Sequence, residues 1–176
     1  IIAHRGWWEQ RPQMNTPEAF EKALSSGFGI ETDLRDHNGE IVISHDMPTG
    51  NEISLQHFFE IYNKCGAVTC LALNIKADGL QKSLKKLIEK YNIGNYFVFD
   101  MSVPDFRLYI QEGIKSFTRK SEYETVPSFL NESKGIWLDE FIGNWLSLDE
   151  LKKLSALNES LCIVSPELHG RAYDKE

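Results

Sequence analysis

The chain of 176 residues has little of several features that would mark other classes of protein. Its three cysteines, Cys65, Cys70 and Cys162, are an odd number without metal-site spacing, so a reducing cytoplasm is the simplest compartment. No apolar run approaches the length of a membrane span, and we expect neither a span nor a signal peptide. Basic residues are outnumbered by acidic ones, 19 to 26, which argues against a general nucleic-acid partner.

What the sequence does contain is the pattern of one α/β domain, which we expect to cover residues 1–176. Short apolar runs typical of buried strands alternate with amphipathic segments that carry helix caps. Strands that alternate with helices predict a parallel sheet covered by helices. The strand-like runs are residues 1–4, 28–34, 41–44, 69–75, 96–100, 114–118, 135–139 and 161–165.

One pair of strands breaks this alternation. Residues 36–39 read Asp-His-Asn-Gly, which is turn chemistry with too little room for a helix. We therefore predict that residues 41–44 return as the second strand of a β-hairpin. Seven strands of the βα type remain.

Three of the runs carry charged or titratable side chains at or near their ends. His4 and Arg5 close the first run, Glu31 and Asp33 lie in the second, and His45 follows the hairpin strand. The carboxyl ends of parallel strands meet at one face. Histidine transfers protons near neutral pH, arginine binds two phosphate oxygens, and paired carboxylates hold a hard cation. This set predicts metal-assisted phosphate chemistry, with His4 and His45 as acid and base.

The two carboxylates form the predicted metal site. Glu31 and Asp33 are two positions apart in a strand, so both side chains point to the same side of the sheet. Oxygen ligands suit Mg²⁺ or Ca²⁺, and we predict such a divalent cation here. An ion pair of one carboxylate with Arg5 or Lys76 is the alternative, and it is compatible with metal binding.

Several short motifs also occur in a fixed order along residues 1–76. The motifs are His4-Arg5-Gly6, Asn15-Thr16-Pro17-Glu18-Ala19-Phe20, Ile30-Glu31-Thr32-Asp33-Leu34, residues 39–43 with His45-Asp46, and Asn74-Ile75-Lys76. Together they resemble the glycerophosphodiester phosphodiesterase family, within the superfamily of phospholipase-C-like phosphodiesterases. The rest of the chain resembles this family only in its alternation of strands and helices.

The resemblance implies a TIM (β/α) barrel and a role in lipid metabolism. Such a barrel has eight strands, so the implied barrel either lacks its eighth strand or continues beyond this sequence. The family uses its two motif histidines, here His4 and His45, as acid and base. A neighbouring hydroxyl of the substrate often acts there as the first nucleophile. Lys76 keeps the family position and is predicted to contact phosphate, together with Arg5.

Asn74 is a departure from the family pattern. The family has Glu-Ile-Lys where this chain has Asn-Ile-Lys at residues 74–76, and that glutamate is a metal ligand. The Asn74 amide oxygen can coordinate a hard cation but brings no charge, so we predict Asn74 as a weaker third ligand. Asp100 and Asp139, each at the end of a later strand, are the alternatives that could complete the site.

The second half of the chain offers further candidates for substrate contacts. Arg119 follows the predicted strand at 114–118 and is predicted to contact phosphate or a second anion. Glu167 and His169 follow the strand at 161–165 and could contact substrate hydroxyls. Surface salt bridges are an equally good interpretation of these three residues.

The sequence thus predicts a metal-dependent phosphoric diester hydrolase whose partner is a small-molecule phosphodiester. The substrate would be a glycerophosphodiester or a sugar-linked phosphodiester. One alternative is a non-catalytic phosphate-binding protein with a metal site degraded through Asn74. The other is a metal-independent lyase in which arginine or lysine replaces the cation.

Overall fold

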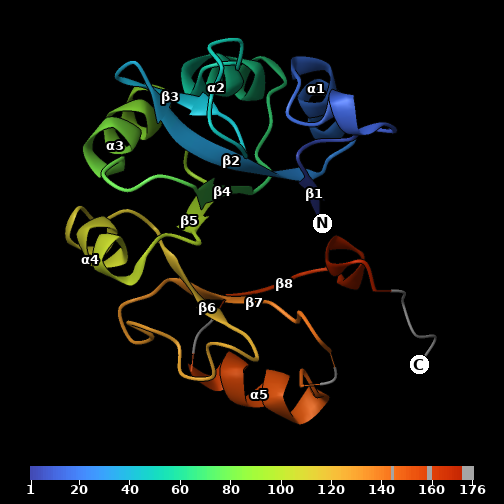
Figure 1. Ribbon diagram of the computed structural model, residues 1–176, viewed down its shortest axis with the longest axis vertical. Coiled ribbons are helices and arrows are strands. Elements are labelled where there is room, and N and C mark those ends of the chain that lie inside the picture. The colour runs from blue at the N-terminus through green and yellow to red at the C-terminus, as the bar shows by residue number, and fades with distance from the viewer. Residues whose placement is uncertain (144, 158–159, 172–176) are drawn as a thin grey trace. The chain divides into compact units, whose positions relative to one another are not determined.

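The computed structural model describes residues 1–143, 145–157 and 160–171. The chain divides into two compact units, Ile1–Ile114 and a second that begins at Lys115. Each unit has its own sheet of parallel strands (Figure 1). Helices lie between most consecutive strands, as the sequence predicts, but the structure describes no helix between β6 (Phe117–Lys120) and β7 (Gly135–Leu138) in the second unit. That the whole chain forms a single barrel domain stays a prediction.

The sheet of the first unit has the strand order β1-β2-β4-β5, and these strands all pair in parallel. The strands are β1 (Ile2–His4), β2 (Gly29–His37), β4 (Leu71–Ile75) and β5 (Tyr96–Phe99). Each of these four strands overlaps one of the strands predicted from the sequence. Because the pairing is parallel, the carboxyl ends of all four strands lie along one edge of the sheet.

Four helices follow strands of this unit, and α1, α2 and α3 lie along the same side of the sheet (Figure 1). Three of the four begin at an N-cap residue whose hydroxyl accepts a hydrogen bond from the amide three residues later. The helices are α1 (Pro17–Ser25, cap Thr16), α2 (Leu55–Lys64, cap Ser54), α3 (Gln81–Lys90, without a side-chain cap) and α4 (Val103–Gln111, cap Ser102).

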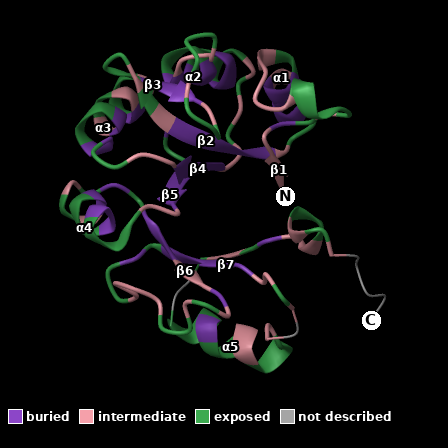
Figure 2. Ribbon diagram, viewed as in Figure 1, coloured by how far each residue is buried: buried purple, intermediate pink, exposed green. Residues whose placement is uncertain are grey.

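The two faces of the sheet have different chemistry because strand side chains alternate. Ile30 and Leu34 of β2 point into the apolar core, where they pack with Phe20 and Phe58 of the covering helices. Glu31 and Asp33 take the alternate positions and point to the opposite face. Figure 2 shows the buried residues of the strands and of the inner helix faces in purple.

The predicted hairpin is confirmed. Strand β3 (Glu40–Ile43) runs antiparallel to β2, and Ile43 pairs with Leu34. Asn38 and Gly39 form the turn with φ values of 50° and 85°, the conformation that a two-residue hairpin turn of this type needs. Strand β3 therefore ends next to Leu34, in the part of β2 that also pairs in parallel with β4.

The second unit contains three parallel strands in the order β6-β7-β8. Its core is formed by Ile136 and Leu138 of β7 with Leu154 of α5. Among the described residues of the whole chain, seven strands pair in parallel, and an eighth is not among them. The elements are β6 (Phe117–Lys120), β7 (Gly135–Leu138), α5 (Leu148–Leu157), β8 (Leu161–Ile163) and the 3₁₀ helix η2 (Pro166–His169).

Strand β6 begins three residues later than predicted, so Arg119 lies within this strand and does not follow it. The reason is the end of the preceding helix. Gly113 adopts φ +73°, and the Ile114 amide still donates to the carbonyl of Tyr109 at 3.0 Å. Ile114 thus belongs to the helix cap.

The turn after β1 depends on Gly6. Gly6 has φ +88°, and a Cβ at this position would lie 2.8 Å from the backbone carbonyl carbon of Ala19. The neighbouring Trp7 amide donates to the Ala19 carbonyl at 2.9 Å. A glycine is therefore required where the turn that carries His4 and Arg5 contacts helix α1.

We expect Gly6→Ala to lower the free energy of unfolding by about 2 to 4 kcal/mol, because strain and a backbone clash add. Gly27→Ala is the matched control, since Gly27 has φ +78° but nothing within 4 Å of its added Cβ. The control should cost only about 1 kcal/mol. Urea unfolding of the two variants measures the difference, and equal losses would contradict the close packing at Ala19.

Candidate active site

The turn that follows β1 holds His4 and Arg5 at the carboxyl end of the sheet. The Arg5 amide donates to the Glu31 carbonyl at 2.8 Å, and the Arg5 carbonyl accepts from the Asn15 amide at 3.0 Å. Arg5 itself adopts a left-handed conformation, with φ 58°. A left-handed arginine is uncommon, and such backbone strain concentrates at functional sites.

The predicted metal ligands lie side by side on two neighbouring strands. Asp33 of β2 pairs in register with Asn74 of β4, and Glu31 lies two positions before Asp33 on the same face. All three side chains are buried, with exposed fractions of 6% for Glu31, 1% for Asp33 and 8% for Asn74. The sheet register therefore brings the three oxygen donors together beneath the strand ends.

Asp33 is at the centre of a charged cluster. Its Oδ2 lies 3.0 Å from Arg5 Nε and accepts from the Asn15 side-chain amide at 3.4 Å. Its Oδ1 lies 3.7 Å from the ammonium of Lys76. The ion pairs that the sequence left as an alternative for one of the carboxylates are thus present.

The site nevertheless keeps free oxygen donors. Among the described residues, Glu31 Oε2, Asp33 Oδ1 and Asn74 Oδ1 are buried and accept no hydrogen bond. The Asn74 side chain also hydrogen-bonds Glu31. Buried oxygens without hydrogen-bond donors suit a hard cation, which takes oxygen ligands. The residues present therefore fit a divalent metal.

No three histidine, cysteine, aspartate or glutamate side chains gather as metal ligands in the described part of the chain. The predicted set contains two of these residue types, Glu31 and Asp33, and an amide oxygen in the third place. The departure at Asn74 thus has a direct consequence, because the site brings one formal charge fewer than a site with three carboxylates.

Glu31 is desolvated next to another acid. Burial first, and the nearby charge of Asp33 second, raise the pKa of Glu31 from 4.5 to about 8. Without a cation, Glu31 thus holds its proton at neutral pH. A bound cation would have to displace this proton, because the ligand form of the side chain is the carboxylate.

His4 is held in the neutral form. Burial first, and the positive charge of Arg5 second, lower the pKa of His4 from 6.5 to about 4. Its Nε2 lies 3.7 Å from Glu31 Oε2, and its Nδ1 is buried without a hydrogen-bond partner among the described residues. A neutral imidazole can accept a proton, so His4 has the character of a base near neutral pH.

The hairpin brings His45 back to the same side of the sheet. The Ser44 amide donates to the Asp33 carbonyl at 3.0 Å, and the His45 carbonyl accepts from Arg35 Nε at 3.0 Å. The exposed His45 ring lies close enough to His4 to lower its pKa. Asp46 Oδ1 accepts a hydrogen bond from His45 Nδ1 at 2.9 Å, which leaves Nε2 open.

Lys76 and Asp100 complete this cluster. The Lys76 amide donates to the Leu34 carbonyl at 2.9 Å, and its ammonium lies 3.5 Å from Asp100 Oδ2. Asp100 adopts φ 71°, a second strained residue at a strand end. The structure therefore pairs Asp100 with Lys76, and its alternative role as a metal ligand stays a prediction.

The remaining candidates belong to the second unit. Arg119 forms an ion pair with Glu124. Asp139 is buried and accepts a hydrogen bond from His169 Nε2 at 2.5 Å, while the His169 ring contacts Phe141. The predicted substrate contacts of Arg119, Glu167 and His169, and the alternative metal role of Asp139, stay predictions.

Two further residues, Asn15 and Trp8, also shape the site. The Asn15 side chain accepts from Thr32 Oγ1 at 2.8 Å and donates to Asp33, and it also has a left-handed backbone. The Trp8 indole donates to the His4 carbonyl at 2.8 Å. The motif that begins at Asn15 was a signal for the first of these roles, because an asparagine tolerates this backbone conformation and hydrogen-bonds through its amide.

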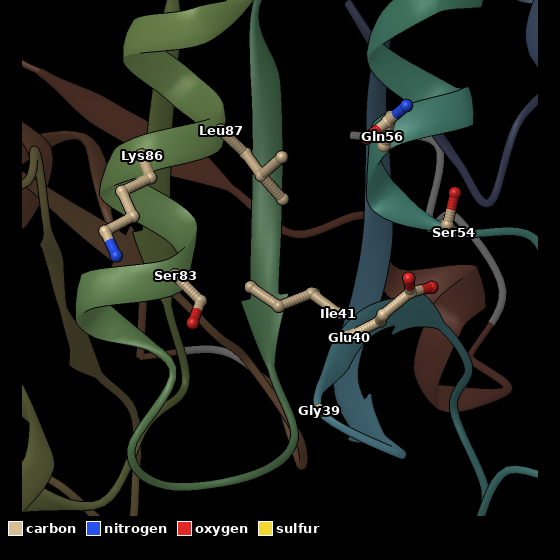
Figure 3. A pocket seen from close by; sticks show the side chains of 8 residues that line it. All are labelled: Gly39, Glu40, Ile41, Ser54, Gln56, Ser83, Lys86 and Leu87. Atoms are coloured by element: carbon tan, nitrogen blue, oxygen red, sulfur yellow. The ribbon is translucent and has the colours of Figure 1, made fainter.

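A cavity of about 380 Å³ lies elsewhere in the first unit (Figure 3). It is bordered by the start of β3, by the beginning of α2 and by α3. None of the candidate catalytic or metal-binding residues contributes to its wall. The lining residues are Gly39, Glu40, Ile41, Ser54, Gln56, Ser83, Lys86 and Leu87.

Comparison with solved structures identifies the fold. A glycerophosphodiester phosphodiesterase from Thermotoga maritima matches with a TM-score of 0.61 and 16% sequence identity, over 93% of this chain and 93% of that chain. A glycerophosphodiester phosphodiesterase from Agrobacterium tumefaciens str. C58 matches with a TM-score of 0.60 and 14% identity, over 96% and 97%. No protein-family model and no curated protein matches the sequence.

The chain therefore has the α/β fold of these phosphodiesterases, and the fold class implied by the sequence resemblance, a TIM barrel, is confirmed. At these identities the comparison shows the fold, and the chemistry has to be argued from the site. Within the described residues, no helix has the length and apolar character needed to cross a membrane.

Because the pKa of Glu31 is raised, we expect the metal-free protein to lose stability as the pH rises from 6.5 to 8. In this window Glu31 keeps its proton in the folded state but has lost it in the unfolded chain. A rise in pH therefore lowers the free energy of unfolding until Glu31 has ionised in the folded state as well. His4 is neutral in the folded state across this window, and the part of it that is still protonated in the unfolded chain near pH 6.5 adds only a small slope of opposite sign. The expected loss is roughly 1 to 2 kcal/mol.

Urea unfolding in EDTA at the two pH values measures this loss. Glu31→Gln is the control, because its amide does not titrate and should make the stability nearly constant across the window. An equal pH dependence in Glu31→Gln would show that another group is responsible.

Proposed function

We propose that this protein is a metal-dependent phosphodiesterase that cleaves a small phosphodiester, either a glycerophosphodiester or a sugar-linked phosphodiester. The observation that supports this most strongly is the set of three buried oxygens of Glu31, Asp33 and Asn74 that accept no hydrogen bond among the described residues, next to the cations Arg5 and Lys76 that pair with Asp33. Such an arrangement can hold a cation and a phosphate group together. The fold shared with phosphodiesterases of known structure is consistent with this function.

Phosphate recognition would fall to Arg5 and Lys76. Both are only partly buried, and both are now paired with the nearly inaccessible Asp33. A guanidinium can bind two phosphate oxygens, and an ammonium supplies a compact charge. Two local cations can hold a small phosphate group in a protein whose net charge is −7.

Glu31, Asp33 and Asn74 would hold the divalent cation, Mg²⁺ or Ca²⁺. When bound, such a cation neutralises charge on the phosphate and polarises its oxygens. The neutral amide of Asn74 leaves this site with less ligand charge than three carboxylates would provide. We therefore expect a weak site that is filled at millimolar metal concentrations.

The two histidines would share the proton transfers. His4 is neutral at physiological pH, so it would take the proton from the attacking hydroxyl or water. His45 is exposed, and its Nδ1 donates to Asp46. In its doubly protonated form, His45 would give the Nε2 proton to the leaving oxygen and keep the proton on Nδ1. As one proton is taken and the other given, the two rings exchange protonation states during the reaction.

The other two functions make distinct predictions. A metal-independent lyase, in which Arg5 and Lys76 replace the cation, would keep its activity in EDTA. A non-catalytic phosphate-binding protein would bind phosphate but turn over no diester. A panel of phosphodiesters assayed with Mg²⁺, Mn²⁺, Ca²⁺ and EDTA separates these functions. The cytoplasmic location inferred from the cysteine content stays a prediction.

We expect Glu31→Ala to abolish metal-dependent turnover while the protein still unfolds cooperatively, because Glu31 contributes to the site and lies on the face of the sheet opposite the apolar core. Asp36→Ala is the matched control, since Asp36 is an exposed acid on the same strand. Turnover in the panel and thermal unfolding are the measurements. Loss of cooperative unfolding in Glu31→Ala would mean that this residue is structural.

Asn74→Glu should tighten divalent binding by roughly tenfold, since it adds a full negative charge to an oxygen-ligand site. The metal concentration for half-maximal activity should fall accordingly, while Asn74→Ala should raise it by removing the amide oxygen. Calorimetry with Mg²⁺ measures the affinity, and turnover is followed in parallel.

A different result would follow if Asn74 contacted phosphate. The new carboxylate would then repel the substrate, and activity would collapse at every metal concentration. Unchanged or weaker metal affinity in Asn74→Glu would refute the role of Asn74 as a metal ligand.

A further inference from the structure

The loop that carries Lys76 is tied to the next loop of the first unit. Residues 76–80 connect β4 to α3, and residues 100–102 connect β5 to α4. Two contacts of exposed or half-buried groups join them. Lys76 Nζ lies 3.5 Å from Asp100 Oδ2, and the Ser102 hydroxyl donates to the Asp78 carboxylate, at 3.1 and 3.2 Å from its two oxygens.

The third contact is made by a buried carboxylate. Asp105 lies in the first turn of α4 and is 4% exposed. Its Oδ1 accepts hydrogen bonds from the Gly79 amide at 3.2 Å and from the side chain of Gln81, which is itself 6% exposed. Its Oδ2 is buried and has no hydrogen-bond partner among the described residues.

A carboxylate in this position is costly, because burial removes its hydration. The positive end of the α4 dipole offsets part of this cost. Helix α4 needs no acid here for its own start, since the Ser102 hydroxyl already accepts from the Asp105 amide at 3.4 Å. What the carboxylate adds is the connection to the preceding loop.

This connection fixes the far end of the lysine loop. The near end is held by the hydrogen bond between the Lys76 amide and the Leu34 carbonyl. Gly79, three residues later, turns with φ +88° and gives its amide to Asp105. With both ends held, the Lys76 ammonium stays between Asp33 and Asp100.

We propose that Asp105 is a positioning residue of the phosphate site, which acts by holding loop 76–80 so that Lys76 faces Asp33. The proposal rests on the proposed function for the identity of the anion that Lys76 binds. Asp105 itself touches neither the metal ligands nor the phosphate. Its removal should therefore weaken anion binding and leave the proton transfers intact.

Binding of inorganic phosphate in the presence of Mg²⁺ and turnover of bis(4-nitrophenyl) phosphate test this. Asp105→Ala should raise the phosphate Kd and the KM by about tenfold, while kcat changes less than threefold. Asp105→Asn should restore most of the affinity, because its amide oxygen can still accept from Gly79. Tyr109→Phe should change neither constant, since it removes a buried hydroxyl of the same helix that has no partner among the described residues.

A double-mutant cycle distinguishes positioning from a general loss of stability. In a Lys76→Ala background, Asp105→Ala should cause no further rise in Kd or KM, because the residue it positions is gone. Amide hydrogen exchange at Gly79 should accelerate in Asp105→Ala and not in Tyr109→Phe. An additive effect in the Lys76→Ala background, or an unchanged phosphate Kd in Asp105→Ala, would overturn the proposal.

Asp78→Ala covers the case in which Asp105→Ala does not fold. Asp78 is exposed, and its removal breaks the contact with Ser102 while α4 keeps its cap. The same proposal predicts a smaller rise in KM for this variant, again absent in the Lys76→Ala background, and additivity there would overturn it. A wild-type protein that neither binds phosphate nor cleaves the diester would instead refute the proposed function.

Discussion

The charge of Asp33 is the constraint on which the candidate site depends. A carboxylate that is 1% exposed has almost no hydration of its own, so the protein has to supply its counter-charges. Arg5 and Lys76 provide these charges, and Asn15 adds a hydrogen bond. The strained backbone of Arg5 and the anchored loop of Lys76 both place a cation next to this one carboxylate.

The same groups explain how metal and phosphate sites can share one edge of a sheet. The cations that would bind phosphate neutralise, in this structure, an acid that would bind metal. Glu31 lies next to the neutral His4 and keeps a proton instead, because its pKa is raised to about 8. The resting cluster is thus electrically balanced, and a cation together with a phosphate could replace these internal pairs without leaving a buried charge uncompensated.

Much of the first unit could be predicted from its sequence because its strands are short, apolar and alternate regularly with capped helices. The shared face of Glu31 and Asp33 follows from strand geometry alone, and the hairpin follows from Asn38 and Gly39. The resemblance in residues 1–76 implied the fold, which the solved structures confirm. The structure also pairs the predicted cations Arg5 and Lys76 with a predicted acid.

The parts that escaped prediction depend on contacts between distant segments. Arg119 was placed after its strand because the sequence does not show that Ile114 continues the helix cap through Tyr109. The role of Asn15 depends on Thr32 and Asp33, which are more than fifteen residues away. The link from Asp105 to Gly79 joins helix α4 to a loop that lies one helix and one strand earlier in the chain. The division into two units likewise has no marker in the composition.

Because of the β2–β3 hairpin, the position of His45 does not depend on the length of the turn that precedes it. His45 is placed by the last pair of the ladder, Leu34 with Ile43, and by the Ser44 amide on the Asp33 carbonyl. The turn at Asn38 and Gly39 lies at the other end of this ladder, beyond the pair of His37 with Glu40. Residues added at the turn would extend the hairpin tip into solvent while the register near Asp33 is retained. The hairpin tip is therefore a place where related sequences can differ in length without displacing the histidine.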